Sequence, residues 1–354
     1  MRRIDRDGML RRVGTLPEQC REAWRQGLAW NVPASLRSAR QVAVLGMGGS
    51  AIGADLVQGL VGEAAVRPLW VNRTYTLPRW IGRETLALVC SYSGNTEETL
   101  SAAEAARRQG AKLLAITSGG TLAGWAGRHR IPLLRIPAGL PPRSAVGYLT
   151  FGPLGLFARL GWILRNGLKV EDALAGLSRW VDSTLTPAVP AARNPAKKLA
   201  GSLRGYLPVL YGAAGGWEGI TYRWRTQIEE NSKSLAFHHL FPEATHNEIS
   251  GWLQPKRFMP GLAAVFLTDP AVHPRTLRRM EFVRRIVLGQ GARAVTISAP
   301  GPTRLERMMK LVALGDFTSV YLGLLYRIDP TPVERVEALK QYLKGSDPEN
   351  GCQD

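Results

Sequence analysis

Residues 85–110 read TLALVCSYSGNTEETLSAAEAARRQG, and this stretch decides the fold. It begins with a short apolar run, continues through a turn rich in Ser, Gly and Asn, and ends in a helical pattern that begins at Glu97. An apolar run closed by turn residues is typical of a buried β-strand. The stretch therefore predicts a strand–loop–helix unit.

The loop of this unit carries three hydroxyl side chains, Ser91, Ser93 and Thr96. The first amides of a helix are unpaired and face the positive end of its dipole, so hydroxyls and backbone N–H groups gathered there form an anion site. An N-cap with a serine turn explains one of these hydroxyls but not three. We therefore expect the loop to bind a phosphate monoester without a Walker-type lysine or a magnesium ion.

The same alternation of apolar runs and helical patterns recurs along the chain. Six further runs begin at Gln41, Val66, Ala111, Tyr206, Leu262 and Ala292. Strands that alternate with helices predict a parallel sheet with helices on both faces. The runs fall into two groups, and 354 residues are too many for one ordinary core. The sequence therefore predicts two α/β domains.

Domain limits follow from the composition between these groups. The stretch 184–196, TLTPAVPAARNPA, has the proline content of a linker, and residues 331–345 form an amphipathic helical pattern that Thr331 could cap. We expect a first domain with leading helices at 1–165, a helix and linker at 166–196, a second domain at 197–330, a C-terminal helix at 331–345 and a disordered tail at 346–354.

The net charge of +18 and the isoelectric point near 10.4 raise the possibility of nucleic-acid binding. The basic residues are spread along the whole chain, without a tail, a stripe or interleaved aromatic residues. Scattered arginine also suits an anionic substrate or a general bias in composition. We therefore do not expect nucleic acid to be the partner, and the charge itself is left unexplained.

Three widely spaced cysteines argue for a reducing compartment, and the N-terminus has no apolar run of the secretory type. The most apolar segment, 145–164, contains Pro153, four glycines and Arg159, which interrupt it below the length that a bilayer needs. We expect this segment to be a buried helix between domains or subunits. The sequence thus predicts a cytoplasmic protein with no membrane partner.

A glycine turn, GMGGSAIG at 46–53, follows the first apolar run and raises a dinucleotide-binding alternative. A nicotinamide site would place a carboxylate at the end of the next strand, where it would hold the ribose. Val71, Asn72 and Arg73 occupy that region instead. The glycine turn is therefore a weak indication of a dinucleotide.

Several longer motifs occur in one order between Gly46 and Lys344. They are GMGGSAIGADL, SYSGNTEET, PPRSAVGYL, QIEENSK, FPEATHNEISGW and DPTPVERVEALK. Together they resemble the bifunctional phosphoglucose/phosphomannose isomerase family. The resemblance implies two sugar isomerase (SIS) domains with flavodoxin-like sheets, a phosphorylated hexose as substrate, a homodimer, and neither metal nor organic cofactor.

Moving a carbonyl between C1 and C2 of a sugar phosphate requires a base, a ring-opening group and a fixed cation for the enediolate. The resemblance implies that Glu230 is the base, that Arg143 stabilises the enediolate, and that Lys340 assists ring opening. It further implies that His246 opens the ring in the partner subunit's site, and we expect a loop to join Glu230 to His246. Without the resemblance, Glu229 and Glu230 would be an exposed pair at a helix end, and the other three would be ordinary structural or surface residues.

The resemblance also implies the residues that bind the substrate. Ser91, Ser93 and Thr96 are expected to hold the phosphate, while Gly48, Gly49 and Ser50 approach the sugar. Thr331 is the candidate for the small side chain that admits either configuration at C2. The roles of Glu229, Glu248, His238 and His239 stay open.

Two other classes of function fit parts of the sequence. A sugar-phosphate sensor would keep the phosphate loop but would not need Glu230, His246 and Lys340. A nucleic-acid binder would use the positive charge. All three candidate catalytic residues are present, so the sequence favours a cofactor-free aldose–ketose isomerase that converts fructose 6-phosphate to glucose 6-phosphate and to mannose 6-phosphate.

Overall fold

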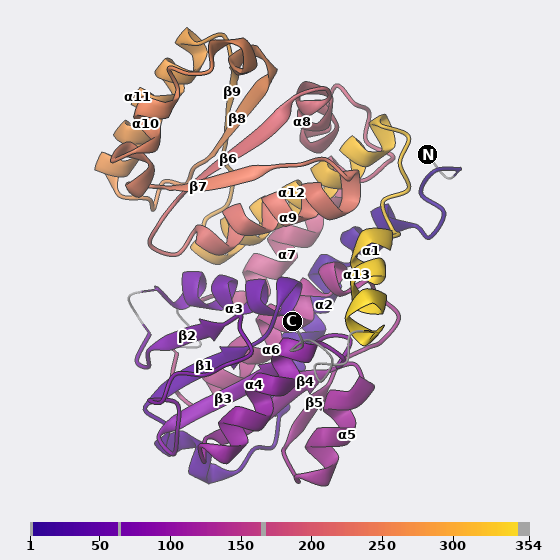
Figure 1. Ribbon diagram of the computed structural model, residues 1–354, viewed down its shortest axis with the longest axis vertical. Helices are drawn as coiled ribbons and strands as arrows, with labels where there is room; N and C mark the ends of the chain where they lie inside the picture. The colour runs from indigo at the N-terminus through magenta and orange to yellow at the C-terminus, as the bar shows by residue number, and fades with distance from the viewer. Residues whose placement is uncertain (1–2, 63–64, 164–167, 346–354) are drawn as a thin grey trace, which may run out of the picture.

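Two parallel β-sheets, each flanked by helices, are stacked one above the other in the computed structural model (Figure 1). The structure describes residues 3–62, 65–163 and 168–345. The tail predicted at 346–354 lies outside the described residues. The prediction of two α/β domains with parallel sheets is confirmed.

The first sheet has the strand order β2-β1-β3-β4-β5, and all its pairs are parallel. Its strands are β1 (Gln41–Leu45), β2 (Leu69–Asn72), β3 (Thr85–Cys90), β4 (Lys112–Thr117) and β5 (Leu133–Arg135). The six residues of β3 are all buried, as expected for a central strand with helices on both faces. This order is the flavodoxin-like one, in which the chain changes direction between β1 and β3.

The second sheet has the order β7-β6-β8-β9, which repeats the pattern of the first without a fifth strand. Its strands are β6 (Leu207–Ala213), β7 (Phe237–Phe241), β8 (Leu262–Leu267) and β9 (Arg293–Ile297), again in parallel. Every predicted apolar run forms a strand. Two strands have no counterpart among the predicted runs: β5, which has three residues, and β7, which falls in the predicted loop between Glu230 and His246.

That loop prediction is wrong because β7 is an edge strand. Only its last residue, Phe241, is buried, and its sequence FHHLF lacks the continuous apolar run of a central strand. Pairing on one side only leaves half of an edge strand in contact with solvent. Polar residues are therefore tolerated in β7, and the strand cannot be recognised from an apolar run in the sequence.

The helices of the first domain pack around its sheet. They are α1 (Met9–Gly14), α2 (Leu16–Ala29), α3 (Gly48–Val61), α4 (Glu97–Arg108), α5 (Gly120–Arg128) and α6 (Val146–Arg159), with short 3₁₀ turns at η1 (Ala34–Ser38) and η3 (Pro142–Ser144). Gly27 of α2 and Gly155 of α6 meet at a close crossing, where a Cβ on either would collide with the other helix's backbone. Helix α6, which forms most of the apolar segment predicted at 145–164, is thus buried, as predicted, but mainly against α2 and α3 of its own domain rather than between domains or subunits.

The second domain is built around α12. Its helices are α8 (Pro195–Leu203), α9 (Glu218–Ser232), α10 (Glu248–Gly251), α11 (Pro274–Gly289) and α12 (Arg304–Leu325), with 3₁₀ turns at η6 (Glu243–Thr245) and η7 (Lys256–Gly261). Among the described residues, α12 is the one helix long and apolar enough to cross a membrane, and 89% of its most apolar window is buried inside the fold. It is therefore a core helix, and it lies with α9 between the two sheets (Figure 1).

Two connections join the domains. Helix α7 (Val170–Trp180) and the π-helical turn η5 (Val181–Leu185) lead to the proline-rich linker, whose Asn194 caps α8 by accepting a hydrogen bond from Lys197 N at 3.0 Å. Helix α13 (Glu334–Gly345) follows the second domain in the chain, and Figure 1 draws it in yellow at the height of the first domain. Because α13 begins at Glu334, the prediction that Thr331 caps it is wrong.

Candidate active site

The point where the first sheet changes direction is the expected place for a ligand, because the loops after its two central strands diverge there and leave a crevice. The glycine turn follows β1 and leads into α3, and the hydroxyl loop follows β3 and leads into α4. The sheet topology therefore brings both predicted binding segments to one edge of the first sheet.

The hydroxyl loop is folded around Ser91, which is almost fully buried. Ser91 Oγ lies 3.0 Å from Thr96 Oγ1 and accepts a hydrogen bond from Gly94 N at 3.1 Å, while Ser93 Oγ accepts one from Asn95 N at 3.2 Å. Thr96 is the N-cap residue of α4, yet its hydroxyl contacts Ser91 instead of capping the helix. The first-turn amides of α4 are thus not occupied by the usual cap and can serve an anion.

The backbone of this loop requires glycine at position 94. Gly94 has a φ of 71°, and a Cβ there would collide with the Gly119 carbonyl oxygen. Only glycine adopts the left-handed region without a steric penalty. The loop therefore owes its shape to a close backbone crossing between the segments that follow β3 and β4.

The glycine turn contributes two different surfaces. Gly48 has a φ of 49° with open space beside it, whereas a Cβ on Gly49 would lie 3.2 Å from the Pro142 carbonyl oxygen. Ser50 is buried, and its Oγ accepts a hydrogen bond from Tyr92 N at 3.3 Å. In this structure, Ser50 accepts a hydrogen bond from the hydroxyl loop, Gly49 packs on the η3 turn, and Gly48 has open space beside it.

Arg143 in η3 connects the first domain to the second. Its side chain is 4% exposed and donates from Nε to Asn231 Oδ1 at 2.7 Å, and from NH2 to the carbonyl oxygens of Pro330 and Thr331 at 2.7 and 2.8 Å. Its NH1 donates to Glu230 Oε2 at 3.3 Å. Burial lowers the pKa of Arg143, and the Glu230 carboxylate opposes that shift. Arg143 is thus a fixed cation beside a carboxylate.

Glu230 lies on the last turn of α9, and its side chain is 38% exposed, so solvent or a ligand can reach its carboxylate. Glu229, its neighbour, points elsewhere and forms an ion pair with Arg225 at 3.8 Å. Burial raises the pKa of Glu229, while Arg225 acts in the opposite direction. The structure therefore separates the two glutamates: one faces Arg143, and the other belongs to the helix surface.

A buried set of residues, not predicted from the sequence, holds Arg143 in place. The amide of Asn231 is fully buried and donates from Nδ2 to Gln227 Oε1 and to Ser319 Oγ, both at 2.9 Å, which fixes the direction of its oxygen. Arg223 donates to both carboxylate oxygens of Asp316 at 2.9 and 2.8 Å, and to the Arg143 carbonyl oxygen at 3.0 Å. No motif in the sequence signals these contacts, because most of them join residues about ninety positions apart.

Thr331 is held in position by hydrogen bonds of its backbone, not of its side chain. Its N–H donates to Asp329 Oδ1 at 3.0 Å, and its carbonyl accepts from Arg143. Its hydroxyl oxygen is buried without a hydrogen-bond partner within the described part of the chain. An unpaired buried hydroxyl is costly, so this atom is a candidate contact for a bound ligand.

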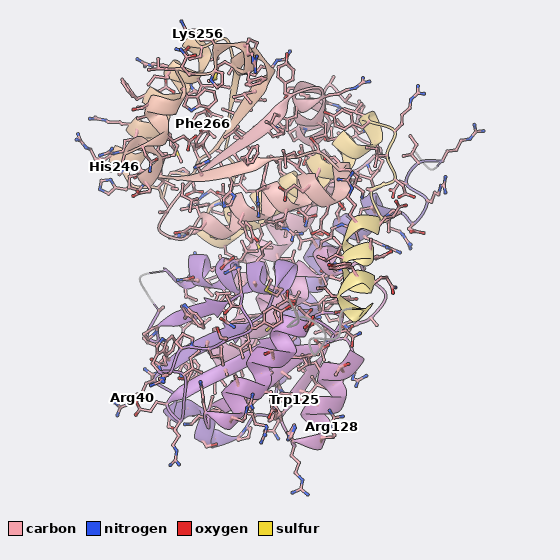
Figure 2. All side chains as sticks on the ribbon, viewed as in Figure 1. Arg40, Trp125, Arg128, His246, Lys256 and Phe266 are labelled. Atoms are coloured by element: carbon pink, nitrogen blue, oxygen red, sulfur yellow. The ribbon has the colours of Figure 1, made fainter. Side chains whose placement is uncertain are left out.

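The remaining candidates lie away from Glu230. His246 is exposed at the outer edge of the second domain, where Figure 2 shows it directed away from the first domain. Lys340 lies on the exposed α13, and within residues 3–62, 65–163 and 168–345 no hydrogen bond or ion pair joins it to Glu230. One copy of the chain therefore brings Arg143 and Glu230 together, but not His246.

The loop that carries His246 is anchored by residues whose roles the sequence left open. The Glu248 carboxylate contacts the Tyr211 hydroxyl and lies 2.8 Å from His239 Nδ1, and Trp252 Nε1 donates to the same hydroxyl at 3.1 Å. His238 packs 5.4 Å from the Tyr222 ring, and burial lowers its pKa to about 4. These contacts give Glu248 and His239 a structural function at the edge of the second sheet.

Comparison with known proteins agrees with the two-domain fold. Residues 35–124 match the SIS domain family, and residues 192–343 match the family described as bacterial phospho-glucose isomerase C-terminal SIS domain. A solved structure, that of a hypothetical protein from Thermus thermophilus, superimposes with a TM-score of 0.69 at 19% identity, covering 96% of this chain and 91% of the other.

Curated relatives cover nearly the whole chain. The bifunctional phosphoglucose/phosphomannose isomerase of Caldicellulosiruptor bescii is 40% identical over 335 residues, which is 95% of this chain and 98% of the relative. The protein of the same name from Aquifex aeolicus is 34% identical and covers 84% of this chain and 89% of the relative. The chain therefore belongs to the bifunctional phosphoglucose/phosphomannose isomerase family.

Proposed function

We propose that the protein interconverts fructose 6-phosphate with glucose 6-phosphate and with mannose 6-phosphate by proton transfer through an enediolate, with Glu230 as the base. The observation that carries the proposal is the contact of 3.3 Å between Arg143 NH1 and Glu230 Oε2. The η3 turn that holds Arg143 packs on Gly49 of the glycine turn, and Ser50 of the same turn accepts a hydrogen bond from the hydroxyl loop. A base, a fixed cation and an anion site are what this reaction needs.

The phosphate of the substrate would bind at the start of α4. Ser91, Ser93 and Thr96 supply hydroxyls, and the uncapped first turn supplies N–H groups and the positive end of the helix dipole. Gly48 leaves room for the sugar on the opposite side of the crevice. Binding of this kind holds the substrate at its non-reacting end, so that the C1–C2 end reaches the base.

In the reaction, the Glu230 carboxylate removes a proton from C1 of the open-chain ketose, and the C1–H electron pair forms the C1–C2 double bond of the enediolate. The negative charge that develops on the former carbonyl oxygen is stabilised by Arg143, which is already fixed by its other contacts. The O1–H proton then moves to this oxygen, the C1=O1 double bond of the aldose forms, and the protonated Glu230 returns its proton to C2 as the C1=C2 electron pair forms the new C2–H bond. Delivery to one face of C2 gives the glucose configuration, and delivery to the other gives the mannose configuration.

To form both glucose 6-phosphate and mannose 6-phosphate, the site must accept either configuration of the C2 hydroxyl. The Thr331 side chain is small, lies beside the Arg143 contact and has an unpaired buried hydroxyl, which supports its assignment to this region of the substrate. Ring opening precedes the proton transfer. We assign it to His246 of a second copy in a homodimer, with help from Lys340, since His246 of the same chain lies at the outer edge of its own domain.

The proposal is tested with Glu230→Gln and its neighbour Glu229→Gln as the matched control. Turnover of fructose 6-phosphate and of mannose 6-phosphate is followed, with chelator present, through the glucose 6-phosphate formed and its dehydrogenase. Loss of the base is expected to lower kcat by roughly 10²- to 10⁴-fold, while Glu229→Gln stays near wild type. A wild-type protein that binds sugar phosphate without turnover would be a sensor instead, and a fully active Glu230→Gln would exclude Glu230 as the base.

A further inference from the structure

Lys233 ends the helix that carries Glu230 and is absent from the set of candidate catalytic residues. It is the C-cap residue of α9 and adopts a left-handed conformation, with φ 52° and ψ 29°. Glycine and asparagine are the usual residues at such a position, because a Cβ is strained there unless, as in asparagine, a short polar side chain compensates. Arg130, Lys169 and Arg327 share this left-handed conformation, so the contacts of the Lys233 side chain, and not its backbone, distinguish it.

The Lys233 ammonium is turned back toward the site. Its Nζ donates to the Glu230 carbonyl oxygen at 2.5 Å and to the Pro330 carbonyl oxygen at 3.1 Å. The first contact is to the residue proposed as the base, and the second is to the segment that leads from α12 into α13. Lys233 thus joins the end of α9 to the Pro330–Thr331 backbone.

The Pro330 carbonyl oxygen is shared between two cations. Arg143 NH2 donates to it at 2.7 Å from the first domain, and Lys233 Nζ donates to it from the second. Arg143 also holds the next carbonyl, that of Thr331. Two positive groups that converge on one neutral acceptor repel each other, and nearby carboxylates offset part of this repulsion.

The charged groups around Lys233 come from three segments. They are Arg143 of η3, Glu230 of α9, and Asp329 and Glu334 on either side of Thr331. The side chain is exposed overall, but its ammonium is turned inward, and this partial burial lowers the pKa of Lys233 to about 8. Arg143 acts in the same direction, while the three carboxylates oppose it.

We propose that Lys233 is a positioning residue for the isomerase reaction: its ammonium fixes the end of α9, and with it Glu230, against the Pro330–Thr331 backbone. This inference rests on the proposed function. Removing the ammonium leaves the phosphate loop untouched, because that loop belongs to α4 of the first domain. The distance between the base and the reacting carbons changes instead, and small displacements of a catalytic group reduce turnover strongly.

The decisive variant is Lys233→Gly. Glycine suits the left-handed backbone, so a merely structural C-cap would be as stable or more stable with it. We expect the melting temperature to stay at or above that of wild type, kcat to fall roughly 10- to 100-fold, and KM for fructose 6-phosphate to change by less than about threefold. Lys198→Met, at an exposed lysine of α8, is the matched control and keeps wild-type kinetics.

Lys233→Arg supplies an independent readout. The ammonium of wild type loses its proton as the pH rises through about 8, so kcat/KM of wild type is expected to decline there. Arginine stays charged throughout, so Lys233→Arg should retain most of the turnover and move this alkaline decline to higher pH. Lys233→Gly should lack the decline, since it has no group to titrate at that position.

The outcomes separate the two proposals. Wild-type kcat and an unshifted pH profile in Lys233→Gly, together with an inactive Glu230→Gln, would overturn the positioning role alone. A large rise in KM at unchanged kcat would also overturn it, because it would make Lys233 a substrate-binding group. Full turnover in Glu230→Gln would refute the proposed base, whatever the Lys233 variants do.

Discussion

Arg143 and Glu230 stand 87 residues apart in the sequence and belong to different domains, yet Arg143 NH1 lies 3.3 Å from Glu230 Oε2. Arg143 is nearly fully buried, and its Nε and NH2 groups are occupied by acceptors on α9 and on the segment before α13. NH1 is the group that faces the exposed carboxylate. The constellation proposed for catalysis therefore exists only when the two domains are docked, and the acceptors around Arg143 fix its orientation before substrate arrives.

Arg143→Lys is expected to impair both turnover and stability. A lysine keeps the charge but lacks the planar fork, so it cannot reach Asn231, the two backbone carbonyls and Glu230 together. Each buried acceptor left without a donor costs about 1–3 kcal/mol, and loss of the fixed cation should lower kcat by about 10²- to 10³-fold. Steady-state kinetics and thermal denaturation measure the two effects.

The control for this change is Arg40→Lys, at an arginine whose side chain is 77% exposed and pairs with Glu84 on the surface. Its effect on the free energy of unfolding should stay within about 0.5 kcal/mol, with kinetics unchanged. An Arg143→Lys protein with wild-type kcat would contradict the assignment of Arg143 to the enediolate.

Ser91→Ala and Thr96→Val are expected to weaken substrate binding more than they slow the chemical step. The two hydroxyls lie 3.0 Å apart at the start of α4, far along the substrate from the carbons that react. Loss of one hydrogen bond to a charged phosphate costs about 1.5–3 kcal/mol, so KM for fructose 6-phosphate should rise by roughly one to two orders of magnitude at a smaller change in kcat. Ser202→Ala on α8 serves as the control. An unchanged KM in both loop variants would show that this loop does not bind the phosphate of the substrate.

The features predicted from the sequence are those that neighbouring residues determine. The strand and helix of residues 85–110 are local patterns, and so is the hydroxyl loop between them, which is why both could be predicted. The edge strand β7 was missed because His238 and His239 replace the apolar run that a central strand would have. Its existence depends on pairing with β6, which is a contact made only after folding.

In the site, too, the features set by neighbouring residues were predictable and those set by long-range contacts were not. The hydroxyl loop was predictable from its own residues, but the assignment of Arg143 and Glu230 to one site rested on the family resemblance alone. Asn231, Arg223 and Asp316 carried no signal, since a buried polar side chain cannot be told from an exposed one without its partners. The sequence also could not show that Lys233 turns back toward Pro330, because that depends on the backbone conformation at the end of α9.

Gly94→Ala should distort the phosphate loop. Gly94 combines a φ of 71° with a backbone crossing at Gly119, so a methyl group there meets both a strained conformation and a collision. The left-handed conformation alone costs roughly 1–2 kcal/mol, and displacement of the loop should raise KM for fructose 6-phosphate. The melting temperature tests the cost of the strained backbone, and the KM tests the displacement of the loop.

Gly127→Ala is the matched control for this glycine. Gly127 lies in α5, where an added methyl group would meet open space and the backbone is not left-handed. Alanine is favoured over glycine in a helix by up to about 1 kcal/mol, so this variant should be as stable as wild type or slightly more so. Equal melting temperatures for Gly94→Ala and Gly127→Ala would refute the proposed backbone requirement.

The assignment of His246 to a neighbouring copy makes a quantitative prediction. If each site uses Glu230 of one subunit and His246 of the other, Glu230→Gln and His246→Asn homodimers should both have little turnover. A heterodimer of the two variants then has one site with both defects and one site with neither. Co-expression with two different affinity tags, followed by purification through both tags, isolates this heterodimer.

The doubly tagged heterodimer should show about half the turnover of wild type, because one of the two sites of a symmetric dimer is intact. If both residues served the same subunit, each site of the heterodimer would carry one defect, and turnover would stay near the level of the homodimers. A wild-type heterodimer with the same two tags controls for the tags. The position of His246 at the outer edge of the second domain, away from its own Glu230, is the reason to expect recovery. Recovery would at the same time show that the protein assembles with itself, since a monomer yields no doubly tagged species.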